Sequence, residues 1–594
     1  MDEALASSGW RVLTQHFESG REAFNLFCVH LEAWQIASYT LSAAFFVLYL
    51  AELASSERPI TERIRARVYH LLRTLPWVKR RIQQDLARAK RQIEEEVHEG
   101  DLTRDFIKFL PERGLSNEEV LSEAALHSSL GFSRKSLLRG SVDPQNRSER
   151  EELNTKILRM FGWSDARDGR SFPGGRKMEA ELVRITLSLF HADSSGCGVV
   201  VPSSSEGILV ALSSLRSTAL RKGIRHPSVL AANSASPALF HAAALLGIRV
   251  DVVACRRDGC LEAAALKRAI RSNTLMIFVS APNHLTGTMD PIEAVAKIGQ
   301  RYGIHVHVDC SVGGFILPFL EMCDYPSPSF DFRLAGISSI SIDLGQSGQS
   351  ASSCAAVLFR DHSMLRRGVF VRYGRPGNLS SSVSLSNSLD GAAVAIAWSS
   401  LLATGRLGFV EMTQRIVEGT ARLAAAIAEI PGVSLVGSSN LCIVAFELEK
   451  EPEQIFAVVD AMRMKEWPLR SITWPAAASV DVTLELVHEA TSAAFIVDLE
   501  TVIVHLLNNP HLAGESGSAA FHRLVDNAGD RWLVEELGRE RALAHYSMPP
   551  PPERRATRSM SLEGRKVSRL LSTTVPPVDS HLRKRQLSDA QINT

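Results

Sequence analysis

Lysine is scarce in this chain and is missing from one long stretch of it. The 594 residues contain 13 lysines against 53 arginines, and no lysine occurs between Lys297 and Lys450. At the chain's own lysine frequency a window of that length holds about three, so composition alone makes the gap only mildly improbable. The gap excludes an amine supplied by residues 298–449, which matters only if the chemistry requires one there.

The chain also has almost no net charge, and it contains no cysteine pair at C-x-x-C spacing. Lys and Arg total 66 against 65 for Asp and Glu, so no global field favours nucleic acid as a partner. The eight cysteines are scattered without a C-x-x-C pair, which argues against a disulfide framework or a zinc ribbon and favours a reducing compartment. With 45% hydrophobic residues the chain is not wholly disordered, and it can bury a sizeable core.

Charged side chains are absent from residues 35–51, which read QIASYTLSAAFFVLYLA. This length is at the short end for crossing a bilayer, and the thinner endoplasmic reticulum membrane relaxes the requirement. We therefore predict a transmembrane anchor over residues 34–53, preceded by a luminal segment, residues 1–33. The alternative is an apolar helix packed inside a soluble domain. Basic residues crowd positions 58–81, so the positive-inside rule places the chain after residue 54 in the cytosol.

An arginine-rich neck is predicted over residues 54–125. Within it, apolar residues recur at helical spacing, at Ile64, Val68, Leu71, Leu72 and Leu75. Two interpretations of its basic face stay open, a solvated surface and contact with anionic lipid headgroups.

From about residue 190 the chain alternates short β-rich runs with amphipathic stretches, which predicts a parallel α/β sheet in a large domain over residues 126–410. The runs are GCGVVV, SVLAANSA, IRVDVVAC, TLMIFVSAP and IHVHVD, with helices expected near 206–222, 238–246, 261–271 and 291–302. Residues 411–510 mix strands, including VDVTLELVH, with helices and predict a smaller α+β domain. Residues 511–594 form an extension, and its Pro-, Ser- and Arg-rich part from about 548 is predicted to be disordered.

Ligands of wound α/β sheets bind where strands end, so residues at strand exits are the candidates for a site. One exit is the small-residue turn at residues 202–207, PSSSEG, which suits either a phosphate or an ordinary serine N-cap. A second is Asp309, whose carboxylate suits a pyridinium nitrogen, a metal or a turn cap. His305, His307 and Asp309 alternate onto one face, but no further ligand cluster completes a metal site, and we predict none. The third exit, SIDLGQ at residues 341–346, follows the run SSISI.

At this point the sequence resembles the sphingosine-1-phosphate lyases, which belong to the pyridoxal 5′-phosphate (PLP) dependent group II decarboxylases. The similarity is strongest in FPGGRKMEAELVRITLSLF (172–190), DPIEAVAKIGQRYGIHVHVDCSVGGF (290–315) and FDFRLAGISSISID (330–343). The resemblance implies an α/β fold of the PLP-dependent transferase type I, aspartate-aminotransferase-like, with an N-terminal transmembrane helix and a smaller C-terminal α+β domain. It also implies a homodimer on the endoplasmic reticulum, single-pass, with the catalytic-type domain in the cytosol. Such an enzyme uses PLP to cleave phosphorylated sphingoid bases to a fatty aldehyde and phosphoethanolamine.

The residues that this family uses are mostly replaced. The family's S-x-D-x-H-K-x-G reads SIDLGQSG, so Gln346 stands at the position of the Schiff-base lysine, Gly345 stands at that of the histidine, and Asp343 matches. The turn S-G-G-T-E-S, which holds the cofactor phosphate, keeps the hydroxyl at Ser205 and the carboxylate at Glu206 but loses both glycines.

Other positions of the family are altered in the same way. The histidine that stacks on the pyridine ring is Ser236, whose hydroxyl cannot stack, whereas Asp309 is retained. The substrate-side segments N-P-L-H-P and G-S-R-P-G read DARDG (165–169) and NSLDG (387–391).

An amide is not a nucleophile and forms no imine, so the resemblance implies that covalent PLP binding is lost here. The status of the chain as an enzyme is therefore uncertain, and the leading expectation is an inactive lyase homologue. It would act as a regulatory or dimerising partner in sphingolipid metabolism, as a homodimer or paired with an active paralogue. Two alternatives remain. One is an enzyme that is still active, either as a PLP-dependent carbon–carbon lyase that uses another amine, such as Lys177 or Lys222, or through PLP-independent chemistry at Asp309 and Asp343. The other is a non-catalytic module that binds a sphingoid-base phosphate through the serine turn with Arg167 or Arg170.

Overall fold

The computed structural model describes residues 32, 34–35, 38–46, 68–98, 107, 109–129, 146–345, 348–351, 353–373, 380–386, 388–513 and 531–547. The chain divides into two compact units, Met1–Arg88 with Asp530–Glu536, and Ala89–Gly529 with Leu537–Thr594. The predicted luminal segment and the tail from residue 548 lie outside the described residues, apart from position 32.

Beyond residue 32, the described part of the first unit is helical except at Leu75. Residues 34–35 and 38–46 of the predicted anchor are helical, and the apolar side chains in 38–46 are exposed. Residues 68–74 form a short helix, and after Leu75 the helix α4 (Pro76–Val97) begins with proline at its first position. Proline lacks an N–H and is tolerated there, which explains why the helix of the neck is interrupted at this point.

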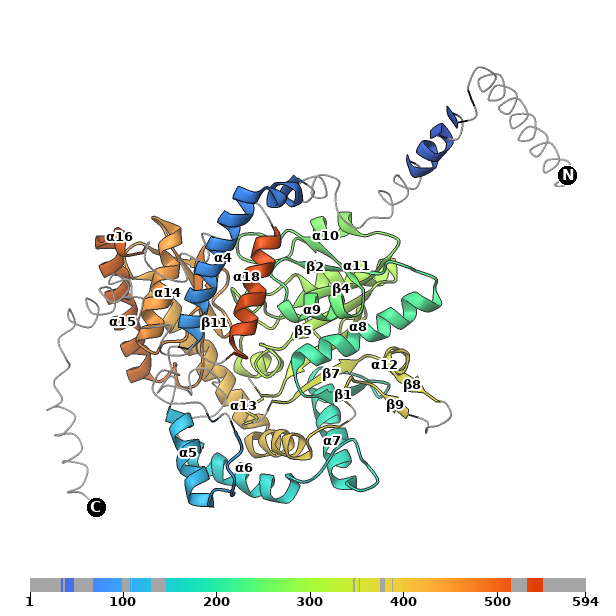
Figure 1. Ribbon diagram of the computed structural model, residues 1–594. Helices are drawn as coiled ribbons and strands as arrows, with labels where there is room; N and C mark the ends of the chain where they lie inside the picture. Colours follow the sequence, from blue (N-terminus) through green and yellow to red (C-terminus); the bar gives the residue numbers. More distant parts are fainter. Residues whose placement is uncertain are drawn as a thin grey trace, which may run out of the picture. The chain divides into compact units, whose positions relative to one another are not determined.

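A seven-stranded sheet forms the centre of the second unit (Figure 1), with the strand order β1-β7-β6-β5-β4-β2-β3. Strand β7 is antiparallel to both of its neighbours, so the sheet is mixed and not wholly parallel as the periodicity predicts. The strands are β1 (Cys197–Val201), β2 (Ser228–Ala232), β3 (Arg249–Val253), β4 (Thr274–Ser280), β5 (His305–Cys310), β6 (Ile337–Asp343) and β7 (Ala355–Phe359).

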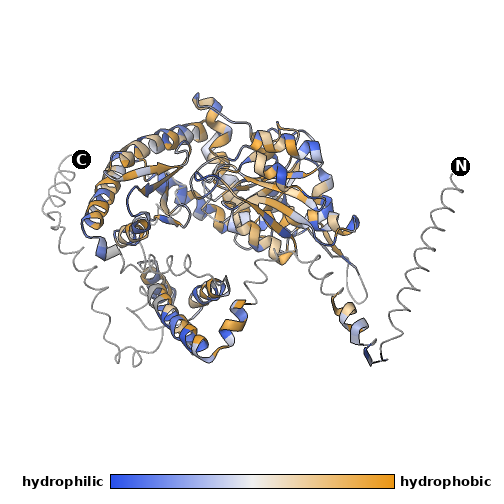
Figure 2. Ribbon diagram, turned by 90° about the horizontal axis from the view of Figure 1, so that it is seen from above, coloured by the Kyte–Doolittle hydropathy of each residue, from blue (hydrophilic) through white to orange (hydrophobic). Residues whose placement is uncertain are grey.

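Helices cover both faces of this sheet, and neighbouring residues of a strand enter different cores. Leu230 and Ile277 belong to a core with α7, α10, α11 and α13 as far as Val417. Val229 and Phe278 belong to the other core, with α8, α9 and α12. Figure 2 shows apolar residues along the strands between these helices. The helices are α7 (Pro173–Leu189), α8 (Ser204–Arg221), α9 (Pro237–Leu245), α10 (Ala263–Ala269), α11 (Ile292–Tyr302), α12 (His362–Gly368) and α13 (Gly391–Ala428), so the four predicted between the β-rich runs are confirmed.

A second sheet follows α13, which is kinked where Gly405 adopts a positive φ of 62°. Its strand order is β10-β11-β13-β12, and it shares a core of its own with α14 and α15. The strand predicted over VDVTLELVH is placed wrongly. The strand ends at Asp481, and Thr483 then accepts the Val487 amide in a turn. The elements are β10 (Val433–Val436), β11 (Ile443–Leu448), α14 (Ile455–Met464), β12 (Arg470–Ile472), β13 (Ala477–Asp481) and α15 (Glu489–Asn508).

Two described helices, α13 and α15, are long and apolar enough to cross a membrane by length and composition. Both supply fully buried side chains to the protein cores, among them Val394, Ile427, Phe495 and Ile503. Such helices pass the same test in soluble domains, so they are not evidence for a span. The remaining helices include α5 (Asn117–Ser129), α6 (Arg147–Phe161), α16 (Pro510–Ala513) and α18 (Arg531–Ala544), and β8 (Phe370–Arg372) pairs with β9 (Ser380–Ser382).

Candidate functional site

The predicted site residues converge on one edge of the large sheet. Because β7 is antiparallel to both β1 and β6, β1 runs parallel to β6 and to the strands beyond it. The carboxyl ends of these strands therefore share an edge, where parallel sheets bind their ligands. Asp309 and Asp343 lie near the carboxyl ends of the adjacent strands β5 and β6. The turn before α8 follows β1, and Ser236 follows β2.

Asp309 is the buried centre of this edge. Its Oδ1 accepts hydrogen bonds from the backbone N–H of Ser311 at 3.1 Å, from the Ser311 hydroxyl at 2.5 Å and from the Ser341 hydroxyl at 3.1 Å. Burial raises the pKa of Asp309, and these donors oppose the rise. The carboxylate that the family directs at a pyridinium nitrogen is thus satisfied on one oxygen by the chain's own hydroxyls.

His307, two residues before Asp309, extends this hydrogen-bonded chain into the sheet. It is fully buried, lies 2.8 Å from the Ser339 hydroxyl through Nδ1 and 3.2 Å from the Ser341 hydroxyl through Nε2, and stacks on Phe278. Burial lowers the pKa of His307 to about 3, so the ring is neutral. Since Ser341 donates to Asp309, its oxygen is free to accept from Nε2–H, which leaves Nδ1 to accept from Ser339.

The N-terminus of α8 lies against the same network. A Cβ placed on Gly207 would be 3.9 Å from the Cβ of Ser341, so the first turn of the helix packs on β6. Ser203 is the N-cap and accepts from the Glu206 amide at 3.3 Å, which uses one of the donors that a phosphate would need. Ser205 is exposed, whereas Glu206 is half-buried and its Oε1 is buried without a hydrogen-bond partner among the described residues.

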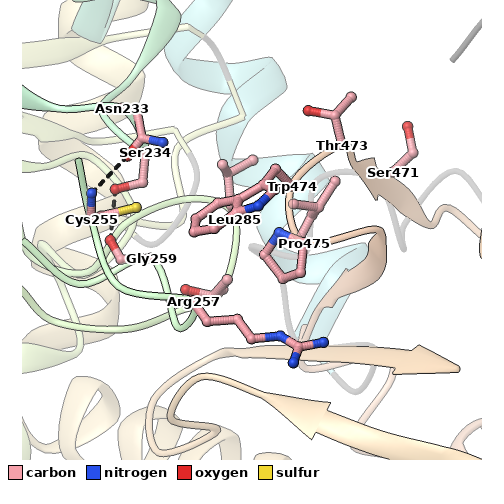
Figure 3. Close-up of a pocket in the computed structure, with 12 residues that line it drawn as sticks. Asn233, Ser234, Cys255, Arg257, Gly259, Leu285, Ser471, Thr473, Trp474 and Pro475 are labelled. Carbon is pink, nitrogen blue, oxygen red and sulfur yellow. Dashed lines mark hydrogen bonds between the residues drawn. The ribbon is translucent and has the colours of Figure 1, made fainter. Parts of the chain in front are cut away.

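Ser236 is also engaged in helix capping, because its hydroxyl accepts from the Ala238 amide at 3.4 Å at the start of α9. Beside this turn a cavity of about 180 Å³ opens between the exits of β2 and β3 and the segment of residues 471–475 (Figure 3). Ser234 donates to the Gly259 carbonyl at 2.7 Å on one wall of the cavity, opposite Trp474. Burial raises the pKa of the Cys255 thiol in the same wall, so this thiol is no ready nucleophile.

Asp343 ends β6, and its Oδ1 accepts the Gly345 amide at 2.7 Å. Both residues are half-buried. Gln346, the residue at the family's lysine position, lies outside the described residues.

The two altered substrate-side segments lie side by side. Asp165 and Asp390 form an isolated antiparallel bridge, and the Asp165 carboxylate accepts the Leu389 amide at 2.9 Å. Asn387 lies outside the described residues. The structure therefore brings together two segments that are separated by more than 200 residues in sequence.

Arg167 is held inside the protein. Its guanidinium donates to Glu179 at 3.2 Å and to the Val200 carbonyl at 2.7 Å. Burial raises the pKa of Glu179, and the Arg167 charge opposes the rise. Both terminal nitrogens of Arg167 are engaged by these partners, whereas its Nε is buried without a hydrogen-bond partner among the described residues. Arg170 is exposed.

No described lysine takes the place of the missing one. Every described lysine is exposed except Lys465, which pairs with Asp498, whereas Asp309 is buried. Lys177 pairs with Glu181 at 2.7 Å. Lys222 is the C-cap of α8, so the 18-residue helix separates it from the turn at Ser203 by about 27 Å. Among the described residues there is also no group of three or more His, Cys, Asp or Glu residues that could hold a metal.

Comparison with known proteins decides the family. Residues 176–449 match the pyridoxal-dependent decarboxylase conserved domain. Sphingosine-1-phosphate lyase 1 of Rattus norvegicus is 30% identical over 541 residues, which cover 91% of this chain and 94% of the rat protein. The chain belongs to the sphingosine-1-phosphate lyase family.

Solved structures agree with this assignment. The sphingosine-1-phosphate lyase of Burkholderia pseudomallei is 28% identical with a TM-score of 0.64, covering 72% of this family member and 98% of the bacterial chain. Glutamate decarboxylase of Lactobacillus brevis, 20% identical with a TM-score of 0.59, covers 69% of this chain and 97% of its own and supports the fold alone. The predicted family and the PLP-dependent transferase fold are therefore confirmed.

Sequence reasoning missed several features of the site in this lyase family member. It treated His307 only as a metal candidate and overlooked Ser311 and Ser341, although the serines of SSISI facing an H-x-H-x-D strand were a readable signal. One alternative named Arg167 or Arg170 as an anion contact, and the pairing of Arg167 with Glu179 could not be anticipated because it depends on a tertiary contact.

Proposed function

We propose that this chain is a catalytically inactive member of its family that acts as a non-catalytic partner in sphingolipid metabolism. One observation carries the proposal. Gln346 stands where the family's Schiff-base lysine is expected, within a stretch of 152 residues, 298–449, that contains no lysine. An amide cannot replace the amine, because its nitrogen lone pair is delocalised into the carbonyl.

The residues at the carboxyl edge of the sheet do not fit a covalently held PLP. Asp309 is present, and Ser311 and Ser341 engage only its Oδ1, but position 346 supplies no amine and the hydroxyls of Ser203 and Ser236 cap helices. We derive no catalytic step through the cofactor. Asp309, Ser205, Glu206, Ser236 and Asp343 are proposed to be remnants of its site.

Pairing with a second subunit is the proposed basis of the regulatory role. Helices α5 and α6 contain no buried residues, and large apolar side chains near them are exposed, with Trp163 97%, Leu110 96% and Phe109 84% accessible. Aromatic side chains are enriched at protein interfaces, and we propose that these residues belong to one. The partner is proposed to be a second copy of this chain or an active paralogue.

The anchor predicted over residues 34–53 is proposed to hold the protein in the endoplasmic reticulum membrane by a single pass, with the enzyme-like region in the cytosol. The exposed apolar side chains of residues 38–46 and the basic residues that follow support this topology.

Borohydride trapping tests the loss of covalent PLP binding. After incubation with PLP and reduction, intact-mass analysis of the purified chain is expected to show no stoichiometric pyridoxyl adduct. The lyase of Rattus norvegicus, treated in parallel, serves as the positive control. Sparse labelling spread over exposed lysines is expected of any protein, whereas a stoichiometric adduct on one lysine would overturn the proposal and favour an active lyase.

Substitution of these exposed apolar residues tests the assembly. Trp163→Glu combined with Phe109→Glu is expected to convert a dimer to monomers in light scattering, because the charges would be buried without partners. Leu245→Glu changes a residue that is 75% exposed on α9, and it is the matched control expected to leave the dimer intact. A double variant that stays dimeric would exclude this surface as the interface.

A further inference from the structure

An exposed apolar stripe runs along residues 68–81, here called the basic segment, which is helical on both sides of a bend at Leu75. Val68, Leu71, Leu72 and Leu75 recur at the spacing of one helix face, and each is exposed, Leu71 to 66%. Trp77 follows and is 70% exposed. Large apolar side chains on a surface are ordinary when scattered, but four of these five residues follow the spacing of one helix face and form an exposed stripe.

The charge of the basic segment has one sign. It contains Arg73, Lys79, Arg80 and Arg81, and the sequence has no acidic residue between Glu62 and Asp85. Arg81 pairs with Asp85, and the Arg73 guanidinium stacks on Trp532 at 4.6 Å. Lys79 and Arg80 are exposed and make no ion pair with any described residue. At least two cations therefore face solvent beside the apolar stripe.

This combination suits the surface of an anionic bilayer. In interfacial helices the apolar face enters the boundary between headgroups and acyl chains, tryptophan lies at that boundary, and Lys and Arg contact anionic headgroups. A solvated surface helix explains the cations but not the exposed stripe. The segment also begins 15 residues after the end of the proposed anchor, which places it within reach of the same membrane.

We propose that the basic segment, residues 68–81, binds the anionic phospholipid surface of a membrane through the stripe Val68, Leu71, Leu72 and Leu75, with Lys79 and Arg80 on the headgroups. The interaction resolves the open interpretation of the neck in favour of headgroup contact. The lipid contact would add a second, charge-dependent attachment to the anchor proposed above. It rests on the proposed anchor only because the anchor brings the basic segment close to the membrane.

Photo-crosslinking in the full chain tests the contact directly. The photoreactive amino acid p-benzoylphenylalanine replaces Leu71, and the protein is reconstituted into phosphatidylcholine vesicles with or without about 30% phosphatidylserine. We expect a lipid adduct at residue 71 in the anionic vesicles. Each basic residue strengthens binding to such a surface by roughly fivefold, so Lys79→Glu with Arg80→Glu and vesicles without phosphatidylserine should each lower the yield at least about fivefold.

Matched controls separate this contact from net charge and from general proximity to lipid. Lys267→Glu with Arg268→Glu alters an adjacent, exposed pair on α10 and is expected to leave the yield unchanged. The same label at Leu245 on α9 is expected to give no lipid adduct. A lipid adduct at Leu245 equal to that at Leu71 would overturn the proposal.

The outcomes distinguish failure of the proposed anchor from failure of the proposed lipid contact. No lipid adduct at residue 71 in anionic vesicles, or an adduct with another protein chain, would also overturn the proposal. Carbonate extraction reports the anchor independently. A carbonate-resistant protein without the adduct refutes only the surface contact, and an extractable protein with the adduct refutes only the anchor.

Discussion

The purified chain is expected to cleave a phosphorylated sphingoid base on the order of 10⁶-fold more slowly than an active relative, the loss typical when a catalytic nucleophile is removed. The physical reason is the amide of Gln346, which forms no covalent link to an aldehyde carbon. Release of the fatty aldehyde, followed with the enzyme of Rattus norvegicus as the reference, measures the effect.

Restoring the lysine alone is expected not to rescue the reaction. Gln346→Lys returns the amine, but Ser236 offers no ring to stack on a cofactor and stays committed to capping α9. Ser203 likewise caps α8 on the side where the phosphate would bind. A combined variant, Gln346→Lys with Gly345→His and Ser236→His, is expected to gain more activity than the single one. Full activity from Gln346→Lys alone would show that the rest of the site is still functional.

Acidification is expected to destabilise the fold through His307. The folded state lowers the pKa of His307 from 6.5 to about 3, so this residue contributes stability that is fully present above pH 6.5 and is lost as the pH falls toward 3. At about 1.4 kcal/mol per unit the total is roughly 5 kcal/mol, of which roughly 2 kcal/mol is lost by pH 5. Asp290, whose pKa burial raises to about 6, and Asp309, whose pKa is also raised, act in the opposite direction, because they gain stability on protonation.

Only a comparison of variants isolates this contribution. His307→Gln lowers the stability at neutral pH but is expected to flatten the slope of unfolding free energy against pH between 6.5 and 4, measured by urea denaturation of the full chain. His241→Gln changes an exposed histidine on α9 and is the matched control, expected to keep the wild-type slope. An unchanged slope in His307→Gln would mean that the ring is protonated in the folded state or does not govern the acid limb.

Residues close in sequence were sufficient to predict much of the large domain. Strands and helices alternate at regular spacing, so the helices between the β-rich runs were placed within a few residues of α8, α9, α10 and α11. The C-terminal domain was predicted less well. The three residues of β12 are too short for a periodic pattern, and the hydrophobic run after Asp481 is buried in a turn and not in a strand.

The sequence by itself determined that the amine required for covalent PLP binding is missing at position 346, because the identity of a residue does not depend on its position in space. A chain without lysine at residues 298–449 has no amine at position 346 in any fold. Only the tertiary structure decided where the remaining groups act. The antiparallel β7 orients β1 so that the first turn of α8 packs near Ser341. Burial keeps His307 neutral between two serine hydroxyls, and Glu179 pairs with Arg167. The physical reason is that hydrogen bonds and burial join residues distant in the chain, and the sequence pattern carries no record of those distances.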